Sequence, residues 1–193
     1  MGTLKAWLAD HWVAAAGFMA GALLALAPLL VRTISLPLVL IFLCSPAYMI
    51  HQVEEHTHDR FRSFFNQRLF GGRNALTVAD VLVVNLPLVW GLNLAALYAA
   101  FAWGDGYGLV APYALIVNAL VHIAAAVRLR IYNPGLITAV VLFIPLGLAT
   151  VYFIGREPGV GIAYHVAGLA IAVLLHVAIV GWVLVRLPRS STA

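Results

Sequence analysis

Apolar residues form six long runs along the chain, and short polar stretches separate them. The runs cover residues 12–31, 36–57, 78–103, 109–127, 136–154 and 162–185. An α-helix needs about 20 mostly apolar residues to cross a bilayer. We therefore expect an all-α fold, in which residues 1–193 form one domain, a bundle of six transmembrane helices.

The composition supports a membrane protein and leaves no room for a soluble domain. Hydrophobic residues make up 64% of the chain and charged residues 9%, with a mean hydropathy of +1.01. Soluble domains carry far more charge. The net charge of +4 would suit nucleic acid, but the basic residues are spread over the loops instead of forming one patch. The lipid bilayer is the expected partner, and nucleic acid is not.

The basic residues are distributed unequally between the two sides of the predicted bundle. With the N-terminus inside, the outer segments carry only Arg32 and Arg156. The inner segments carry nine basic residues, which are Lys5, Arg60, Arg62, Arg68, Arg73, Arg128, Arg130, Arg186 and Arg189. Cytoplasmic loops are enriched in Lys and Arg. This pattern predicts a multi-pass protein of the plasma (inner) membrane with both termini in the cytoplasm.

The end of the second run holds the densest group of polar residues. If the helix continues through this end, four side chains follow at i, i+3, i+4 and i+7 and share one face, within about 100°. They are His51, Glu54, Glu55 and His58. Such spacing is typical of a metal site, whereas the alternative is a charged loop that leaves the membrane.

Two further runs carry polar residues at a similar depth. Asn118 and His122 are an i, i+4 pair in the fourth run, and His176 lies in the sixth. His51, His122 and His176 each lie six to ten residues before the first arginine on the inner side, so all three are roughly 9 to 15 Å inside the membrane boundary. Polar residues at such depth face the bundle interior. This level favours a pocket open to the cytoplasm, although a membrane histidine can also serve only as an interhelical hydrogen bonder.

The polar connections predict local structure. Phe61, Phe64, Phe65 and Leu69 share a helical face, which predicts a short amphipathic helix in the inner interface. A more specific hypothesis is that this helix forms a lid over the site or borders the point where a lipid enters it.

Two helix starts are also predicted. Thr77 is expected as an N-cap with Asp80 in the first turn, and Asn133 as an N-cap with Pro134 at the first helical position. Tyr132 either belongs to the aromatic belt or leans over the site.

Three motifs occur in order in the middle of the chain. They are His51-Gln52-Val53-Glu54-Glu55, Asn118 to His122 as N-x-x-x-H, and Tyr132-Asn133-Pro134-Gly135 as Y-x-P-G. In these motifs the sequence resembles the HXXEE family of multipass membrane proteins. The resemblance implies an active-site role for the HxxEE segment but no particular reaction.

The leading functional hypothesis is a metal-dependent hydrolase. His51, Glu55 and His122 are the first choice as ligands of a divalent ion, with His58, Asn118 and His176 as further candidates. Zinc is favoured and iron is the alternative. Glu54 would act as the general base and Tyr132 would assist over the site. The expected substrate is a lipid-like amphiphile that enters from the cytoplasmic leaflet.

Three other interpretations stay open. The segment Glu55 to His58 supplies one Glu-x-x-His, as in di-iron bundles, but those use two such motifs and further carboxylates. A transporter for a metal ion or protons would need polar residues that continue to the outside. Alternatively, the polar residues form a structural polar knot, a cluster of mutually hydrogen-bonded side chains that fixes helix packing and has no catalytic role.

Overall fold

The structure is a computed structural model, and it describes residues 2–186, in which every regular element is helical. The first half contains α1 (Gly2–Leu30), α2 (Leu36–His56), η1 (Thr57–Asp59), α3 (Arg60–Phe64), η2 (Phe65–Leu69), α4 (Val78–Val83), η3 (Val84–Trp90) and α5 (Gly91–Trp103). The second half contains η4 (Asp105–Leu109), α6 (Val110–Leu129), α7 (Leu136–Thr138), η5 (Ala139–Phe143), α8 (Ile144–Ile154) and α9 (Ile162–Arg186).

Six helices in the described range are long and apolar enough to cross a bilayer. They are Ala9–Leu30, Leu36–Leu69, Val78–Trp103, Asp105–Leu129, Leu136–Ile154 and Ile162–Val185. The predicted all-α fold with six spanning helices is confirmed, and the chain is an integral membrane protein.

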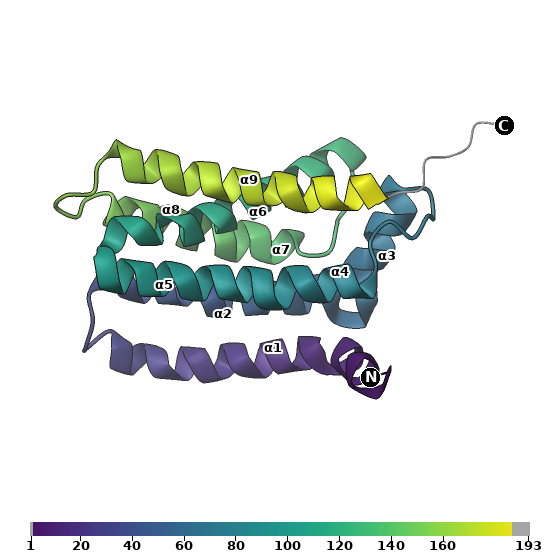
Figure 1. The fold of residues 1–193 in the computed structure, drawn as a ribbon, viewed down its shortest axis with the longest axis horizontal. Coiled ribbons are helices and arrows are strands. Elements are labelled where there is room, and N and C mark those ends of the chain that lie inside the picture. The colour runs from purple at the N-terminus through teal and green to yellow at the C-terminus, as the bar shows by residue number, and fades with distance from the viewer. Residues whose placement is uncertain (1, 187–193) are drawn as a thin grey trace.

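The helices lie side by side along the length of the molecule (Figure 1). Helix α1 lies at one edge and packs against α2, while α9 lies at the opposite edge and packs against α6 and η4. Helix α2 also contacts α5, α6 and α8. It is thus enclosed on several sides and can bring polar side chains to the centre of the bundle.

Small side chains form much of the contact surface between the central helices. Cys44 and Ala47 of α2 are buried with Ala96 of α5 and with Ala114 and Ala119 of α6. Without a hydrophobic driving force in lipid, close backbone approach supplies much of the attraction between membrane helices. The outer faces of α1 and α9 are apolar, as their exposed Phe18, Leu29, Leu174 and Val185 show.

The connections confirm one helix start and correct another. Thr77 caps α4 in a capping box with Asp80, as predicted. The prediction for Asn133 is wrong: α7 begins at Leu136, after Gly135. The Asn133 side chain bonds to His122 instead, so it is not available to cap a helix.

The short amphipathic helix is present as α3 and η2. His58 and Asp59 both have positive φ angles, 56° and 58°. These left-handed residues turn the chain out of α2, so the assumption that α2 continues to His58 is wrong. The turn folds the phenylalanines of α3 and η2 back towards the end of α2.

Candidate metal centre

The last two turns of α2 place two side chains of the HxxEE segment in the interior. His51 and Glu55 are one turn apart and therefore point to the same side. Both are buried, with exposed fractions of 1% and 7%. His122 of α6 approaches from across the bundle and is buried as well.

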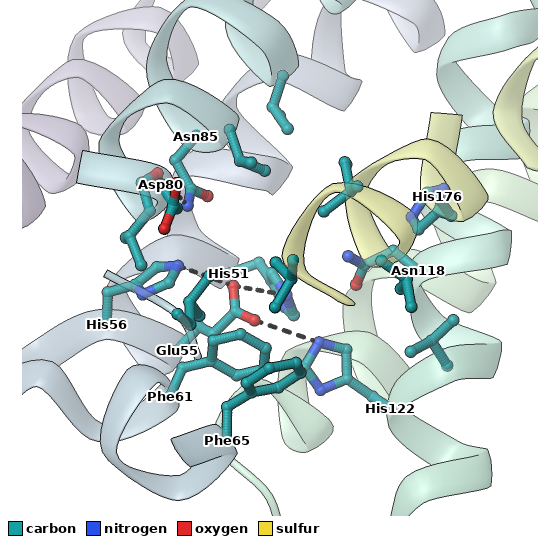
Figure 2. A pocket seen from close by; sticks show the side chains of 18 of the residues that line it. His51, Glu55, His56, Phe61, Phe65, Asp80, Asn85, Asn118, His122 and His176 are labelled. Carbon is teal, nitrogen blue, oxygen red and sulfur yellow. Dashed lines mark hydrogen bonds and ion pairs between the residues drawn. The ribbon is translucent and has the colours of Figure 1, made fainter. Parts of the chain in front are cut away.

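These three side chains converge on one point (Figure 2). His51 Nε2 lies 3.6 Å from Glu55 Oε2, and His122 Nε2 lies 3.5 Å from Glu55 Oε1. One donor atom from each residue falls within 4.8 Å of the others, so the group could hold a metal ion. Ligand atoms in a tetrahedral zinc site, bound at about 2.0 to 2.1 Å, are roughly 3.3 Å apart. The observed distances fit that spacing.

The hydrogen bond on the far side of His51 fixes which of its nitrogens carries a proton. His51 Nδ1 lies 2.8 Å from Thr138 Oγ1. That hydroxyl has a single proton, and it donates to Glu54 Oε2 at 2.5 Å or to the Gly135 carbonyl at 3.2 Å. His51 Nδ1 must therefore donate to Thr138. In a neutral ring, Nε2 is then left with a bare lone pair, and it has no hydrogen-bond partner.

His122 is held in the same state by Asn133. The Asn133 amide nitrogen donates to the His122 carbonyl at 2.9 Å, which fixes the orientation of the amide. Its oxygen Oδ1 lies 2.6 Å from His122 Nδ1, so this nitrogen must donate. In their neutral state, both imidazoles would therefore present unprotonated Nε2 atoms to a carboxylate. Three acceptors that face each other in a buried site are stabilised by a cation between them, which can be a metal ion or an imidazole that carries a second proton.

Gly135 makes the close approach of the two histidines to each other and to the backbone feasible. A Cβ atom at this position would lie 2.7 Å from His122 Cε1 and 2.8 Å from His51 Cε1. The residue also has a φ angle of +97°, which favours glycine. The segment after α6 therefore approaches both rings only because its residue 135 has no side chain.

Comparison with known protein families gives a match over the part of the chain that holds these residues. Residues 42–150, more than half of the chain, match a family model described as "Protein of unknown function with HXXEE motif". The chain belongs to this HXXEE family. No curated protein and no solved structure matches it.

The second glutamate of the HxxEE motif has a different environment. Glu54 lies outside the central group and accepts four hydrogen bonds, from Tyr132 Oη, from the backbone N–H groups of Ile137 and Thr138, and from Thr138 Oγ1. The two N–H groups open helix α7, so the carboxylate stabilises that helix start. Glu54 is joined to His51 through Thr138, in a carboxylate–hydroxyl–imidazole chain.

Tyr132 stands over Glu54 and not over the central group. Its hydroxyl donates to Glu54 Oε1 at 2.7 Å. Partial burial and then this hydrogen bond to a carboxylate raise the pKa of Tyr132 to about 12. The phenol therefore keeps its proton near neutral pH and remains a donor to Glu54.

The other predicted ligands lie at different distances from the group. His58 is exposed beyond the end of α2 and lines a separate cleft between α1 and α2. Asn118 and His176 line the same cavity as the central group. Asn118 Oδ1 has no hydrogen-bond partner, whereas His176 Nδ1 bonds to the Ala172 carbonyl at 2.8 Å.

Three residues at the site were not assigned to it from the sequence. His56 Nε2 lies 3.1 Å from Glu55 Oε2, whereas the sequence placed His56 equally well in a loop. Thr138 carried no signal, because a single threonine near a helix start is common. Asn133 was considered only as a helix cap. Gly135, two residues after Asn133 in the Y-x-P-G motif, was the signal available for a close backbone approach.

The central group opens into a cavity of about 200 Å³. Polar side chains surround the end near Glu55, and apolar side chains from α3, η2, α4, η3, α6 and α9 form the rest of the wall. Phe61 and Phe65 lie directly beside the group in Figure 2. The candidate metal centre of this HXXEE protein thus forms the polar end of an otherwise apolar cavity.

Proposed function

We propose that this HXXEE protein is a membrane-embedded, metal-dependent hydrolase that acts on a lipid-like or amphiphilic substrate from the cytoplasmic leaflet. One observation carries the proposal. The Nε2 atoms of His51 and His122 converge on the Glu55 carboxylate in a buried site, at 3.6 and 3.5 Å. This arrangement is unfavourable when the site is empty and favourable around a divalent cation.

Zinc is the favoured ion and iron is the alternative. Two imidazoles and one carboxylate form the ligand set of many catalytic zinc sites, which keep a further position open. The same set also suits non-haem iron. When bound, such an ion would polarise a carbonyl or phosphoryl oxygen of the substrate and lower the pKa of a coordinated water.

The residues around the ligands hold and shield the site. Asn133 and Thr138 keep His122 and His51 in the tautomer that a metal requires. Phe61 and Phe65 cover the group and exclude bulk water. We assign Glu54 and Tyr132 a positioning role in place of direct catalysis, because the Glu54 carboxylate already accepts four hydrogen bonds.

The other interpretations are less well supported. A structural polar knot would be expected to satisfy its members, yet His51 Nε2 and Asn118 Oδ1 lack hydrogen-bond partners. A di-iron site needs several carboxylates, and within the described residues the group contains Glu55 alone. On the outer side, His165 pairs with Tyr113 at 2.9 Å away from the cavity, so a continuous polar route across the bundle is not supported.

The orientation in the membrane is also part of the proposal. Nine basic residues on one side against two on the other favour cytoplasmic termini and a plasma (inner) membrane location. The metal centre then lies in the cytoplasmic half, which suits a substrate from the inner leaflet.

Metal analysis of protein purified without chelator tests the proposal. We expect about one zinc or iron per chain, and loss of the metal in the double variant His51→Ala/Glu55→Ala. His165→Ala is the matched control, since it removes a histidine of the membrane region that lies outside the cavity. Equal metal content in all three proteins would contradict the proposal.

Hydrolysis is tested separately. The metal-loaded protein in lipid nanodiscs is incubated with ester and amide amphiphiles, and products are followed by mass spectrometry. Turnover should cease on chelation and return with zinc. If the protein contains the metal but cleaves neither ester nor amide bonds, the metal centre is supported and hydrolysis of these two bond types is excluded.

A further inference from the structure

The apolar part of the cavity is built mainly by three membrane-facing segments. Helix α9 contributes one face, and η3 with the start of α5 forms the opposite wall. The phenylalanines of α3 and η2 close the cytoplasmic side. The α9 face consists of Leu175, His176, Ile179, Val180 and Val183.

Part of the cavity wall is formed by residues that also reach the outer surface of the bundle. Three lining residues are about half exposed: Leu69 of η2 at 46%, Val121 of α6 at 53% and Val180 of α9 at 49%. All three are apolar. We call this part of the wall, formed by Leu69, Val121 and Val180, the lateral mouth.

The packing of α9 explains why the mouth lies there. In the outer half, α9 packs closely on η4 and α6, where a Cβ atom at Gly168 would lie 3.1 Å from Leu109 of η4 and 3.2 Å from Tyr113 of α6. At the inner end, Trp182 Nε1 donates to Asp80 Oδ1 at 3.4 Å, and Val183 packs with Leu76 and Val81. Both ends of α9 are therefore attached, and the cavity opens between them.

We propose that the cavity takes one alkyl chain of a bilayer amphiphile, which enters through the lateral mouth with its polar group next to the metal centre. An apolar mouth in contact with lipid admits a chain without exposing it to water, whereas a polar solute would have to leave water to reach it. The volume favours a single chain, because a cavity of about 200 Å³ is smaller than the usual ligand pocket of about 300 to 1,000 Å³. Only the place of the polar group rests on the proposed function.

The sharpest test uses two adjacent leucines of α9. Leu175 lines the cavity, whereas Leu174 is 66% exposed to lipid and does not line it. Leu175→Trp fills the space of the chain, and Leu174→Trp adds the same bulk on the lipid side. A second pair tests the mouth: Val121→Trp blocks it, while Leu120→Trp changes a neighbour that is 54% exposed and lies outside the cavity.

The proteins are reconstituted in phosphatidylcholine nanodiscs that contain a monoacyl phosphatidylcholine with a diazirine on its chain. After irradiation, adducts are mapped by mass spectrometry. We expect adducts on the cavity-lining residues of α9 and η3. We also expect labelling there to fall roughly tenfold in Leu175→Trp and Val121→Trp, as for one steric misfit in an apolar pocket, and to persist in both controls. Labelling that is equal in each pair, or confined to lipid-facing residues, would overturn the proposal.

Metal content measured on the same samples separates this proposal from the proposed function. All four variants should keep the metal of the unmodified protein, which also shows that they are folded. Cavity labelling in a protein without metal would support the chain site and contradict the metal centre. A metal-containing protein without cavity labelling would give the opposite result.

Discussion

Replacing Gly135 by alanine is expected to disable the metal centre without changing a ligand. Gly135 lies against the edges of both histidine rings, and a new methyl group would lie 2.7 Å from His122 Cε1 and 2.8 Å from His51 Cε1. Carbon atoms in contact prefer separations of about 3.5 to 4.0 Å. The rings, the backbone or both must therefore move apart by roughly 0.7 Å.

Such a displacement is large for a metal centre. Metal–ligand distances tolerate only about 0.2 Å, so the two rings could no longer bind one ion with good geometry. Disturbing the residues that orient ligands typically lowers metal affinity about 10- to 100-fold, and we expect a loss of that size. The φ angle of +97° adds backbone strain of about 1 to 2 kcal/mol for any residue with a Cβ atom.

A second glycine serves as a control that separates the effect of backbone strain from the effect of the steric clash with the histidine rings. Gly159 has a φ angle of +86°, but a Cβ atom at this position would have no neighbour within 4 Å. Zinc affinity is measured by competition with a chelator of known affinity, and stability by thermal unfolding in detergent. Both Gly→Ala variants should lose stability, and only Gly135→Ala should lose zinc affinity. Equal zinc affinities would refute the reasoning that His51 and His122 bind one ion.

Three further outcomes are expected. Thr138→Val removes a hydroxyl at nearly constant shape and should lower zinc affinity about tenfold or more, since His51 loses the partner that fixes its tautomer; unchanged affinity would contradict this orienting role. Glu55→Gln should lower zinc occupancy, whereas Glu54→Gln should keep zinc but reduce the free energy of unfolding by about 1 to 3 kcal/mol; elemental analysis with thermal unfolding would show the reverse if the roles are exchanged. For topology, exposed Thr33→Cys should react with an impermeant maleimide from outside, and Gln67→Cys only after permeabilisation.

The helical spans were predictable because each depends on a long apolar run alone. From α2 at Leu36 to α9 at Ile162 the expected starts of the spans and the observed helix starts agree within a few residues, whereas α1 begins at Gly2, ten residues before the expected range. The pairing of His51 with Glu55 was predictable for a similar reason, because residues four apart lie on the same helix face. Properties that depend on regular periodicity could thus be predicted without tertiary contacts.

The end of α2 could not be predicted in this way. Helical spacing places His58 beside His51 and Glu55 only while the helix continues, and the turn at His58 and Asp59 interrupts it. Both residues tolerate a left-handed conformation moderately well, but nothing in their sequence requires it. The packing of α3 against the bundle decides the turn, and that packing is non-local.

The supporting residues of the site were hidden for another reason. Asn133 lies in the connection after α6 and Thr138 in the short helix α7 that follows it, and each has a common local explanation near a helix start. Their contacts with His122 and His51 exist because this connection folds back across the end of α2. Such an approach depends on the tertiary fold, and the glycine of the Y-x-P-G motif was its one local indication.

The two adjacent glutamates explain how these segments are joined. Neighbouring side chains on a helix point about 100° apart, so two adjacent residues of one helix turn can contact two different parts of the structure. Glu55 faces the cavity and the two histidines, while Glu54 faces the start of α7 and binds its N–H groups. Because Thr138 bonds to both Glu54 and His51, the contact that fixes α7 on α2 also fixes a candidate ligand of the proposed metal centre. A single carboxylate could not do both, since its four hydrogen bonds would leave no lone pair directed at a cation. The geometry therefore requires the second glutamate of the motif beside the first.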